Sequence, residues 1–236
     1  MFGHLMKRLI FTETKPDCVI FLQGSTPHPD ILSFFTDSPC IATDGAANGL
    51  ISLGVIPDII IGDLDSFDPD HLPKHAHSFI IHIPDQEKND FEKALDYCKK
   101  QEYQHILIYG IHGGDFEHSL NNVSVLWKYV DRFQQITIVD SQQRIAIPVF
   151  FDMICEELYP SEVISLIPFP HAHISTKGLE WNLENEVLEL SKREGARNRS
   201  IGKKVSIEHF EGRFLFFCDA RFPAFPVFTN YPSSFF

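Results

Sequence analysis

Residues Asp58–Phe67 read Asp-Ile-Ile-Ile-Gly-Asp-Leu-Asp-Ser-Phe, and the rest of the chain is organised around them. Its isoleucine run predicts a short buried strand. Gly62 follows the run and gives the backbone greater conformational freedom there. If the chain stays extended to Asp65, the side chains of Asp63 and Asp65 project to the same side. Two such carboxylates repel each other unless a cation lies between them. This pattern predicts a divalent metal, with Mg²⁺ favoured for an all-oxygen site that also holds a polyphosphate. The alternative is a polar turn whose aspartates cap the next segment.

Apolar runs of the same kind recur throughout the first half of the chain. They are Val19–Leu22, Cys40–Thr43, Ile59–Ile61, Phe79–Ile83, Ile106–Tyr109 and Ile136–Val139. Between most of them lie segments with helical spacing, among them Ala46–Leu53, a helix that begins near Asn89, and Phe116–Val130. Continuous apolar strands that alternate with amphipathic helices indicate a parallel sheet covered on both faces.

Chemically informative residues follow the predicted strands. They are Gln23, Gly24 and Ser25, then Asp44 and Gly45, then Asp63 and Asp65, then Gln86 and Asp90, and finally Gly110, Gly113 and Gly114. Ligands of parallel α/β sheets bind beyond the carboxyl ends of the strands, so we expect these residues to gather at one edge. The blander alternative remains open for Asp44 and Asp90, which also suit a helix cap and a helix dipole.

The pattern changes after Asp140, where short strand-like runs replace the helical spacing. These runs are Arg144–Phe150, Glu162–Pro168, Glu186–Leu190, Lys204–Phe210 and Arg213–Cys218, with turns marked at Lys177-Gly178, Glu194-Gly195 and Glu211-Gly212. The fold class is therefore α/β plus all-β. We predict an N-terminal parallel-sheet α/β domain at 1–142 and a C-terminal β-sandwich at 143–236, with a tail at 219–236 that is rich in Phe and Pro.

Composition narrows the class of protein. A net charge of −12 argues against a nucleic-acid backbone as the main partner, because such proteins carry a basic patch. The five cysteines are scattered singly, which argues against a disulfide framework. No apolar stretch is long enough for a bilayer, and no signal-peptide pattern opens the chain. The sequence predicts a cytoplasmic protein with reduced thiols and no membrane association.

One stretch of the second half also carries polar and aromatic groups suited to a ligand. Ser175–Asn182 reads Ser-Thr-Lys-Gly-Leu-Glu-Trp-Asn. A tryptophan beside turn residues and hydroxyls can stack on a flat, cationic heterocycle. The alternative is a tryptophan of the core.

These blocks together resemble the thiamine pyrophosphokinase (thiamine diphosphokinase) family. The matching blocks are Asp44–Asn48, Pro57–Ser66, Pro84–Leu95, Gly110–Asn122 and Thr176–Leu183, with a weaker one at Gly195–Val205. They cover most of the chain from about residue 40 to residue 217. The resemblance implies an ATP-binding α/β domain, a thiamine-binding β-sandwich, and a homodimer with active sites at the subunit interface. It also implies Mg²⁺-dependent transfer of the pyrophosphoryl group of ATP to the thiamine hydroxyl, with release of AMP.

The resemblance also assigns roles to individual positions. The magnesium carboxylates are Asp63, Asp65 and Asp90; the nucleotide-side residues are Asp44, Gly45, Asn48, Gly113, Gly114 and His118; the thiamine-side residues are Gln86, Ser175, Thr176, Trp181 and Asn198. Trp181 is expected to stack on the pyrimidine of a thiamine held largely by the other subunit. Either Asp65 or Asp90 is expected to help accept the hydroxyl proton.

The sequence departs from the family pattern at the glycine loop. The family usually reads Gly-Gly-Arg-x-Asp-His, whereas this chain has Gly-Gly-Asp-Phe-Glu-His at 113–118. Asp115 and Glu117 thus place negative charge where an arginine would hold phosphate, which leaves the nucleotide preference open. We hypothesise that Arg197 or Arg199 supplies the missing charge. Two alternatives remain: a pyrophosphokinase for another hydroxymethyl heterocycle such as a pterin, and a non-catalytic thiamine- or nucleotide-binding homologue.

Overall fold

A computed structural model describes residues 6–231 of the chain, which divide into two compact units. One unit is Lys15–Gln143, and the other combines the N-terminal residues up to Thr14 with the chain from Arg144 onward. The last five residues of the predicted tail, 232–236, lie outside the described residues. The units are described separately below.

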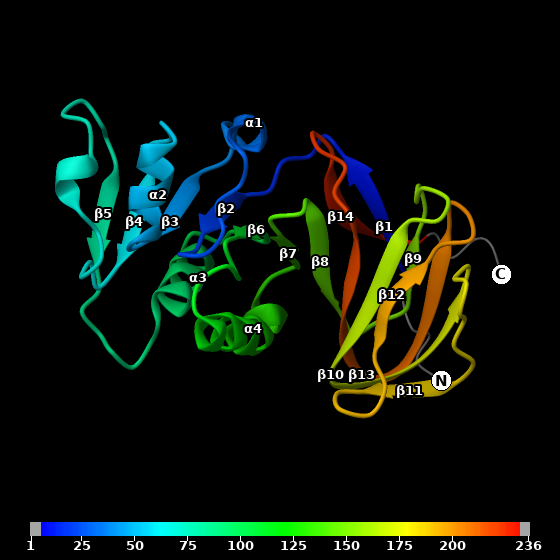
Figure 1. Ribbon diagram of the computed structural model, residues 1–236. Coiled ribbons are helices and arrows are strands. Elements are labelled where there is room, and N and C mark those ends of the chain that lie inside the picture. The colour runs from blue at the N-terminus through cyan, green and yellow to red at the C-terminus, as the bar shows by residue number, and fades with distance from the viewer. Residues whose placement is uncertain (1–5, 232–236) are drawn as a thin grey trace. The chain divides into compact units, whose positions relative to one another are not determined.

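The first unit is a parallel α/β sheet (Figure 1). Its strands are β2 (Cys18–Phe21), β3 (Cys40–Thr43), β4 (Ile59–Gly62), β5 (Phe79–His82), β6 (His105–Tyr109) and β7 (Gln135–Val139). They lie in the order β5-β4-β3-β2-β6-β7, and every adjacent pair is parallel. All six predicted strands are therefore confirmed. The chain reverses its direction of travel across the sheet at β2, which is where α/β sheets place their ligand crevice.

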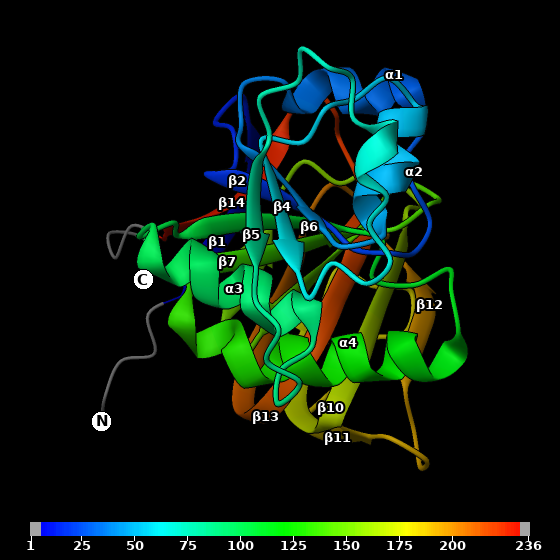
Figure 2. The ribbon, with the colours of Figure 1, turned by 90° about the vertical axis from the view of Figure 1, so that its left-hand side faces the viewer.

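Helices cover both faces of this sheet. They are α1 (Pro29–Leu32), α2 (Ala46–Ser52), α3 (Asp90–Lys100) and α4 (Phe116–Tyr129), with short 3₁₀ turns η1 (Ser33–Phe35), η2 (Pro69–His71) and η3 (Val130–Arg132). Figure 2 shows α1 and α2 on one side of the sheet and α3 and α4 on the other. The predicted capping box of α3 is present, because Asn89 and Glu92 bond each other's backbone amides. In residues 6–231, no helix combines the length and apolar character that a bilayer span requires.

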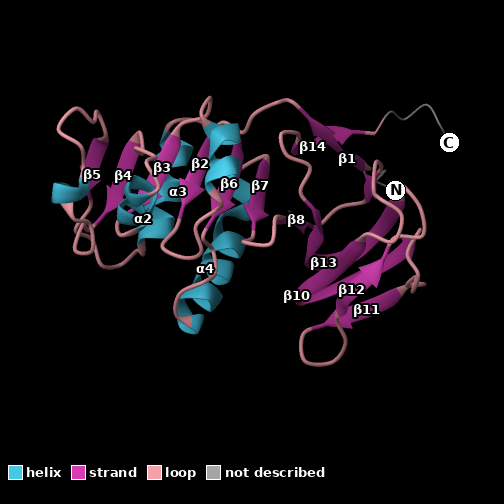
Figure 3. Cartoon of the chain, turned by 45° about the horizontal axis from the view of Figure 1, so that its top comes forward, coloured by secondary structure: helices cyan, strands magenta, loops and turns pink. Residues whose placement is uncertain are grey.

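The second unit contains only strands among its regular elements, as Figure 3 shows. The strands are β1 (Lys7–Thr12), β8 (Arg144–Val149), β9 (Met153–Cys155), β10 (Val163–Lys177), β11 (Glu186–Glu189), β12 (Gly195–Arg199), β13 (Val205–Asp219) and β14 (Phe225–Asn230). The long strands β10 and β13 pair antiparallel, and along most of β10 buried residues alternate with more exposed ones. Alternation of this kind lets one face of a strand join the core. The predicted all-β character is confirmed.

Three details differ from the sequence-based expectations. The α/β domain was expected to begin at residue 1, but β1 pairs with β14 and β9 and thus belongs to the second unit. No strand was predicted in the tail at 219–236, yet β14 lies within it, held by the same pairing. The expected turn at Glu211-Gly212 is a point within the continuous strand β13. Gly212 adopts a φ of +80° there, and the register with β10 shifts nearby.

Candidate active site

The carboxyl edge of the parallel sheet holds a cleft of about 470 Å³. It is lined by residues that follow β2, β3, β4 and β5 and by the first turns of α3 and α4. Among the residues singled out from the sequence, the cleft brings together Asp44, Asp63, Asp65, Gln86, Asp90 and His118. Residues distant in sequence thus meet because parallel strands end at a common edge.

Three carboxylates at this edge lie close enough to share a cation. One ligand oxygen from each of Asp44, Asp63 and Asp65 lies within 4.8 Å of the other two. Gly62 permits this approach, since a Cβ there would come within 3.0 Å of Asp44 Cβ and Asp90 Oδ1. The two aspartates after β4 do not converge along an extended strand as expected. Leu64 between them has a φ of +63°, so a tight turn brings them together.

Asp44 is the most enclosed carboxylate of the cleft. Only 4 % of the residue is exposed, and its Oδ2 accepts a hydrogen bond from the Ser66 amide at 3.2 Å. Its Oδ1 has no hydrogen-bond partner among the described residues. Burial, with a smaller contribution from the neighbouring carboxylates, raises the pKa of Asp44 to about 6. A buried carboxylate oxygen without a donor suits an oxygen-seeking cation.

Asp63 and Asp65 each have a polar neighbour. Gln86 Nε2 donates to Asp63 Oδ2 at 2.9 Å, and this bond lowers the pKa of the Asp63 carboxyl. Ser66 Oγ donates to Asp65 Oδ1, also at 2.9 Å. Gln86, expected on the thiamine side, is therefore placed beside the acidic cluster. Both carboxylates stay at least partly exposed, so they remain accessible to ions and ligands from the cleft.

Asp90 is the first residue of α3, and its partner is a lysine that the sequence analysis did not select. Lys93 Nζ donates to Asp90 Oδ1 at 2.9 Å and lies 4.0 Å from Asp63 Oδ2. The sequence spacing could have indicated Lys93, because residues three apart on a helix, such as Asp90 and Lys93, face the same side. Asn121 and Asn122 also line the cleft without having been predicted, one turn beyond His118 on α4.

The remaining nucleotide-side residues support the loops around the cleft. Asn48 Nδ2 donates to the Ser66 carbonyl at 2.8 Å, and its Oδ1 accepts from the Asp68 amide at 3.0 Å. Asn48 thus fixes the segment that follows the two aspartates. Gly45 opens α2 and leaves room for Gln23, whose side chain would lie 2.8 Å from a Cβ at that position.

The glycine loop packs against the segment that follows β2. Gly113 has a φ of +103°, and a Cβ there would lie 2.0 Å from Ser25 Oγ. The Ser25 amide donates to the His112 carbonyl at 2.7 Å. Gly113 and Gly114 are exposed but are not among the residues that line the cleft. The loop leads into α4 with Asp115 as its N-cap and Glu117 in its first turn, so this helix start is acidic.

The expected thiamine-side residues Ser175, Thr176, Trp181 and Asn198 all lie in the β unit. Trp181 is 62 % exposed and does not belong to the core. Asn198 holds its backbone from both sides, accepting from the Trp181 amide at 3.2 Å and donating to its carbonyl at 2.7 Å. The hydroxyls of Thr176 and Ser175 accept from the Leu183 and Asn185 amides, each at 2.8 Å, and so shape the loop that carries the tryptophan.

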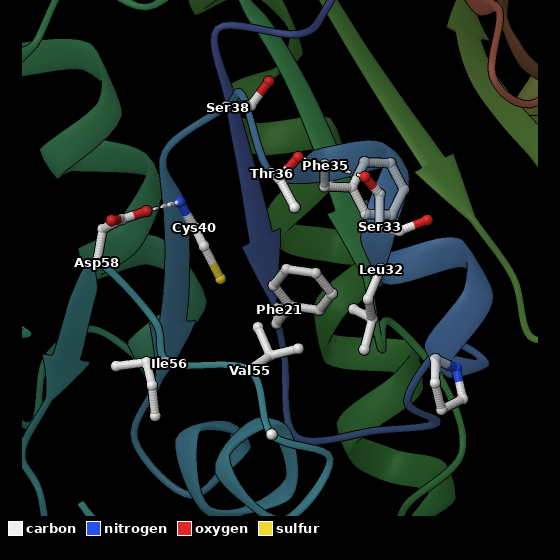
Figure 4. A pocket seen from close by; sticks show the side chains of 12 residues that line it. Phe21, Leu32, Ser33, Phe35, Thr36, Ser38, Cys40, Val55, Ile56 and Asp58 are labelled. Carbon is white, nitrogen blue, oxygen red and sulfur yellow. Dashed lines mark hydrogen bonds between the residues drawn. The ribbon is translucent and has the colours of Figure 1, made fainter. Parts of the chain in front are cut away.

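A second pocket of about 380 Å³ lies among residues that precede β3 and β4 (Figure 4). Phe21, Leu32 and Val55 form part of its apolar lining. Its carboxylate, Asp58, accepts from the Cys40 amide at 2.7 Å and so joins the starts of these two strands. This pocket is mostly apolar and includes none of the predicted site residues, so we assign the chemistry to the carboxyl-edge cleft.

Comparison with known proteins addresses both halves of the chain. Residues 35–139 match the family model "Thiamin pyrophosphokinase, catalytic domain", and residues 154–212 match "Thiamin pyrophosphokinase, vitamin B1 binding domain". The chain belongs to the thiamin pyrophosphokinase family. The predicted resemblance is thereby confirmed, and the four aspartates of the cleft lie within the part matched by the catalytic-domain model.

Individual relatives agree with the thiamin pyrophosphokinase assignment. Thiamin pyrophosphokinase 1 of Caenorhabditis elegans is 28 % identical over 181 residues, covering 71 % of this chain and 74 % of the relative. Thiamine pyrophosphokinase of Bacillus subtilis (strain 168) is 27 % identical over 165 residues, covering 66 % and 76 % respectively. A crystal structure of thiamine pyrophosphokinase from Bacillus subtilis aligns with a TM-score of 0.73 at 21 % identity, covering 86 % of this chain and 99 % of that one. The structural likeness supports the predicted fold class.

Proposed function

We propose that the chain transfers the pyrophosphoryl group of ATP to the hydroxyl of thiamine, giving thiamine diphosphate and AMP. The observation that carries this proposal is the carboxylate trio Asp44, Asp63 and Asp65 at the carboxyl edge of the sheet. It lies in a chain whose two halves match the catalytic and the vitamin B1 binding models of one family. Both the nucleotide chemistry and the acceptor therefore have a matching part of the chain.

The donor set of the cleft fits Mg²⁺. All candidate ligand atoms are carboxylate oxygens. The buried Oδ1 of Asp44 has no hydrogen-bond donor among the described residues, and a cation can take the place of that donor. We propose that Asp63, Asp65 and Asp90 hold the ion, as the family resemblance implies, and that Asp44 adds a further oxygen. When bound, the metal neutralises the negative charge of the polyphosphate.

The residues of the chain then have separable tasks in the reaction. The thiamine oxygen attacks the β-phosphorus, the bond from that phosphorus to the α-phosphate oxygen breaks, and AMP leaves. Asp65 or Asp90 accepts the hydroxyl proton. Gln86 keeps Asp63 in its ionised form, and Asn48 fixes the loop after Asp65. Positioning and charge compensation account for most of catalysis in reactions of this class.

Thiamine binding is assigned to the β unit. The exposed ring of Trp181 is available to stack on a flat, cationic heterocycle, while Asn198 fixes the backbone on which the ring stands. The hypothesis that Arg197 or Arg199 grips phosphate stays a prediction. Arg199 Nη1 donates to the Ser161 carbonyl at 3.0 Å, an interaction within its own unit.

We also propose a cytoplasmic homodimer with its active sites at the subunit interface. Large apolar side chains that a partner surface would cover are exposed at Phe116 and Leu120 of α4 and at Ile201. No disulfide is recorded among the five cysteines, which suits a reducing compartment. Light scattering coupled to size exclusion tests the assembly, and a monomer at micromolar concentration contradicts it.

An AMP-release assay tests the proposed function. Purified protein is given ATP, Mg²⁺ and thiamine, and AMP is measured by a coupled enzyme, with Asp63→Asn as the matched control. We expect turnover that requires all three components and falls at least about 100-fold in the variant, as for loss of a metal ligand. Turnover only with a hydroxymethyl pterin supports the other pyrophosphokinase. Thiamine binding by calorimetry without any turnover supports the non-catalytic homologue.

A further inference from the structure

Lys93 is a buried cation inside the acidic cleft. Its side chain is 3 % exposed and comes from the first turns of α3. The ammonium is bonded to Asp90 Oδ1 at 2.9 Å and stands 4.0 Å from Asp63 Oδ2. Its pairing with Asp90 offsets the free-energy cost of burying the ammonium, so Lys93 provides a fixed positive charge within the cleft.

The cleft is otherwise strongly acidic. Four aspartates line it, whereas the lysines among its lining residues are Lys88 and Lys93. Lys88 is 42 % exposed, so its charge is screened by solvent, and it is bonded at 2.6 Å to Asp96, which does not line the cleft. Among the described residues that line the cleft, Lys93 is therefore the one buried lysine.

Among the described residues, α4 contributes no lysine or arginine to the lining of the cleft; its contributions are His118, Asn121 and Asn122. This helix begins with Asp115 as its N-cap and Glu117 in its first turn. Such acids oppose the positive end of the helix dipole, which in other proteins attracts phosphate. Among the described residues that line the cleft, the lysines therefore lie just before and within the start of α3.

Lys93 retains hydrogen-bonding capacity for that contact. A lysine ammonium has three N–H donors, and within residues 6–231 Lys93 uses one of them, for its hydrogen bond to Asp90. The Asp63 oxygen at 4.0 Å is beyond hydrogen-bond distance. The ammonium can therefore keep its bond to Asp90 while it donates to a second oxygen in the cleft.

We propose that Lys93 is a catalytic residue that donates a hydrogen bond to an oxygen of the transferring pyrophosphoryl group. This inference rests on the proposed function. As the bond between the β-phosphorus and the α-phosphate oxygen breaks, negative charge redistributes over the phosphoryl oxygens, and the buried ammonium stabilises it. No covalent bond to Lys93 forms, and the hydroxyl proton goes to a carboxylate. Lys93 thereby supplies the fixed charge that the glycine loop lacks.

The test compares Lys93→Met with Lys99→Met, which removes the same charge from the same helix outside the cleft. Both are assayed for kcat, for KM and for calorimetric binding of Mg²⁺ with α,β-methylene-ATP, whose bridge cannot be cleaved. In Lys93→Met we expect kcat to fall about 100-fold or more and the analogue to bind about tenfold more weakly, with KM for thiamine unchanged. Values within about threefold of Lys99→Met overturn the proposal. Recovery of kcat at saturating Mg²⁺ also overturns it, because Lys93 would then act only through the carboxylates.

A crystal structure of the wild-type protein with Mg²⁺ and the analogue keeps the proposal testable if Lys93→Met does not fold. Lys93 Nζ within hydrogen-bond distance of a β- or γ-phosphate oxygen supports it, and an ammonium bonded only to Asp90 contradicts it. The two proposals fail separately. Absence of AMP release by the wild type removes the proposed function, whereas analogue binding and the structure still decide whether Lys93 contacts phosphate.

Discussion

Asp44 provides a quantitative prediction, because its carboxylate is ionised at neutral pH in a site that disfavours the charge. Its pKa is raised from 3.8 to about 6, mainly by burial. At about 1.4 kcal/mol per pH unit, a shift of roughly two units corresponds to a cost of about 3 kcal/mol in the metal-free folded state. Asp44→Asn removes this charge. Asparagine tolerates the φ of +28° at this position, and its carbonyl can still accept from the Ser66 amide.

We therefore expect metal-free Asp44→Asn to be more stable than the wild type at pH 7.5, by up to about 3 kcal/mol and several degrees in Tm. The sign with pH follows from linkage. The folded-state pKa of Asp44 lies above the unfolded value, so the wild type loses stability as the pH rises from about 4 to about 6. The advantage of the variant should therefore disappear toward pH 4 and reach a plateau above pH 6.

Thermal unfolding in EDTA between pH 4.5 and 7.5 measures this difference, with the exposed Asp37→Asn as the matched control. Addition of Mg²⁺ should raise the Tm of the wild type and raise that of Asp44→Asn by less, because the variant lacks one proposed ligand. A variant that melts at or below the wild type in EDTA at pH 7.5 refutes the reasoning. So does a stability difference that is the same at both ends of the pH range.

Three further substitutions test other parts of the structure. Trp181→Ala should raise KM for thiamine about tenfold while changing Tm little, since the ring is exposed; steady-state kinetics and calorimetry check this. Gly113→Ala should lower the free energy of unfolding by about 1–3 kcal/mol and reduce activity. Gly202→Ala, which has open space around it, should change neither. Denaturant unfolding and turnover assays measure both effects. Arg221→Met should lower the free energy of unfolding by about 3–5 kcal/mol, because it leaves the fully buried Glu162 carboxylate without its ion-pair partner. Chemical denaturation measures this, and an unchanged unfolding midpoint would contradict that role.

Local sequence predicted the α/β unit well. Five of its six strands are apolar runs buried almost throughout, whereas the edge strand β5 is apolar but largely exposed. The start of α3 carries a local cap, Asn89. The convergence of the carboxylates after β3, β4 and β5 was likewise predictable, because parallel strands end at one edge. These features depend on residues close together in the chain or on a general rule of topology.

Other features depend on contacts between distant residues. The strands β1 and β14 come from opposite ends of the sequence and stabilise each other through pairing, so neither carries a strong pattern of its own. Similarly, the continuity of β13 through Gly212 depends on β10.

The sequence of Asp58–Phe67 specifies a buried strand, a flexible glycine at the end of that strand, and two carboxylates after it. Their geometry, in contrast, depends on contacts with other segments of the fold. The backbone conformation at Leu64 brings Asp63 and Asp65 together. Burial leaves Asp44 with an oxygen that has no hydrogen-bond partner among the described residues. Helix α3 places the Lys93 ammonium beside Asp90. The physical reason is that desolvation and charge pairing arise from the packing of several segments, which no single segment encodes.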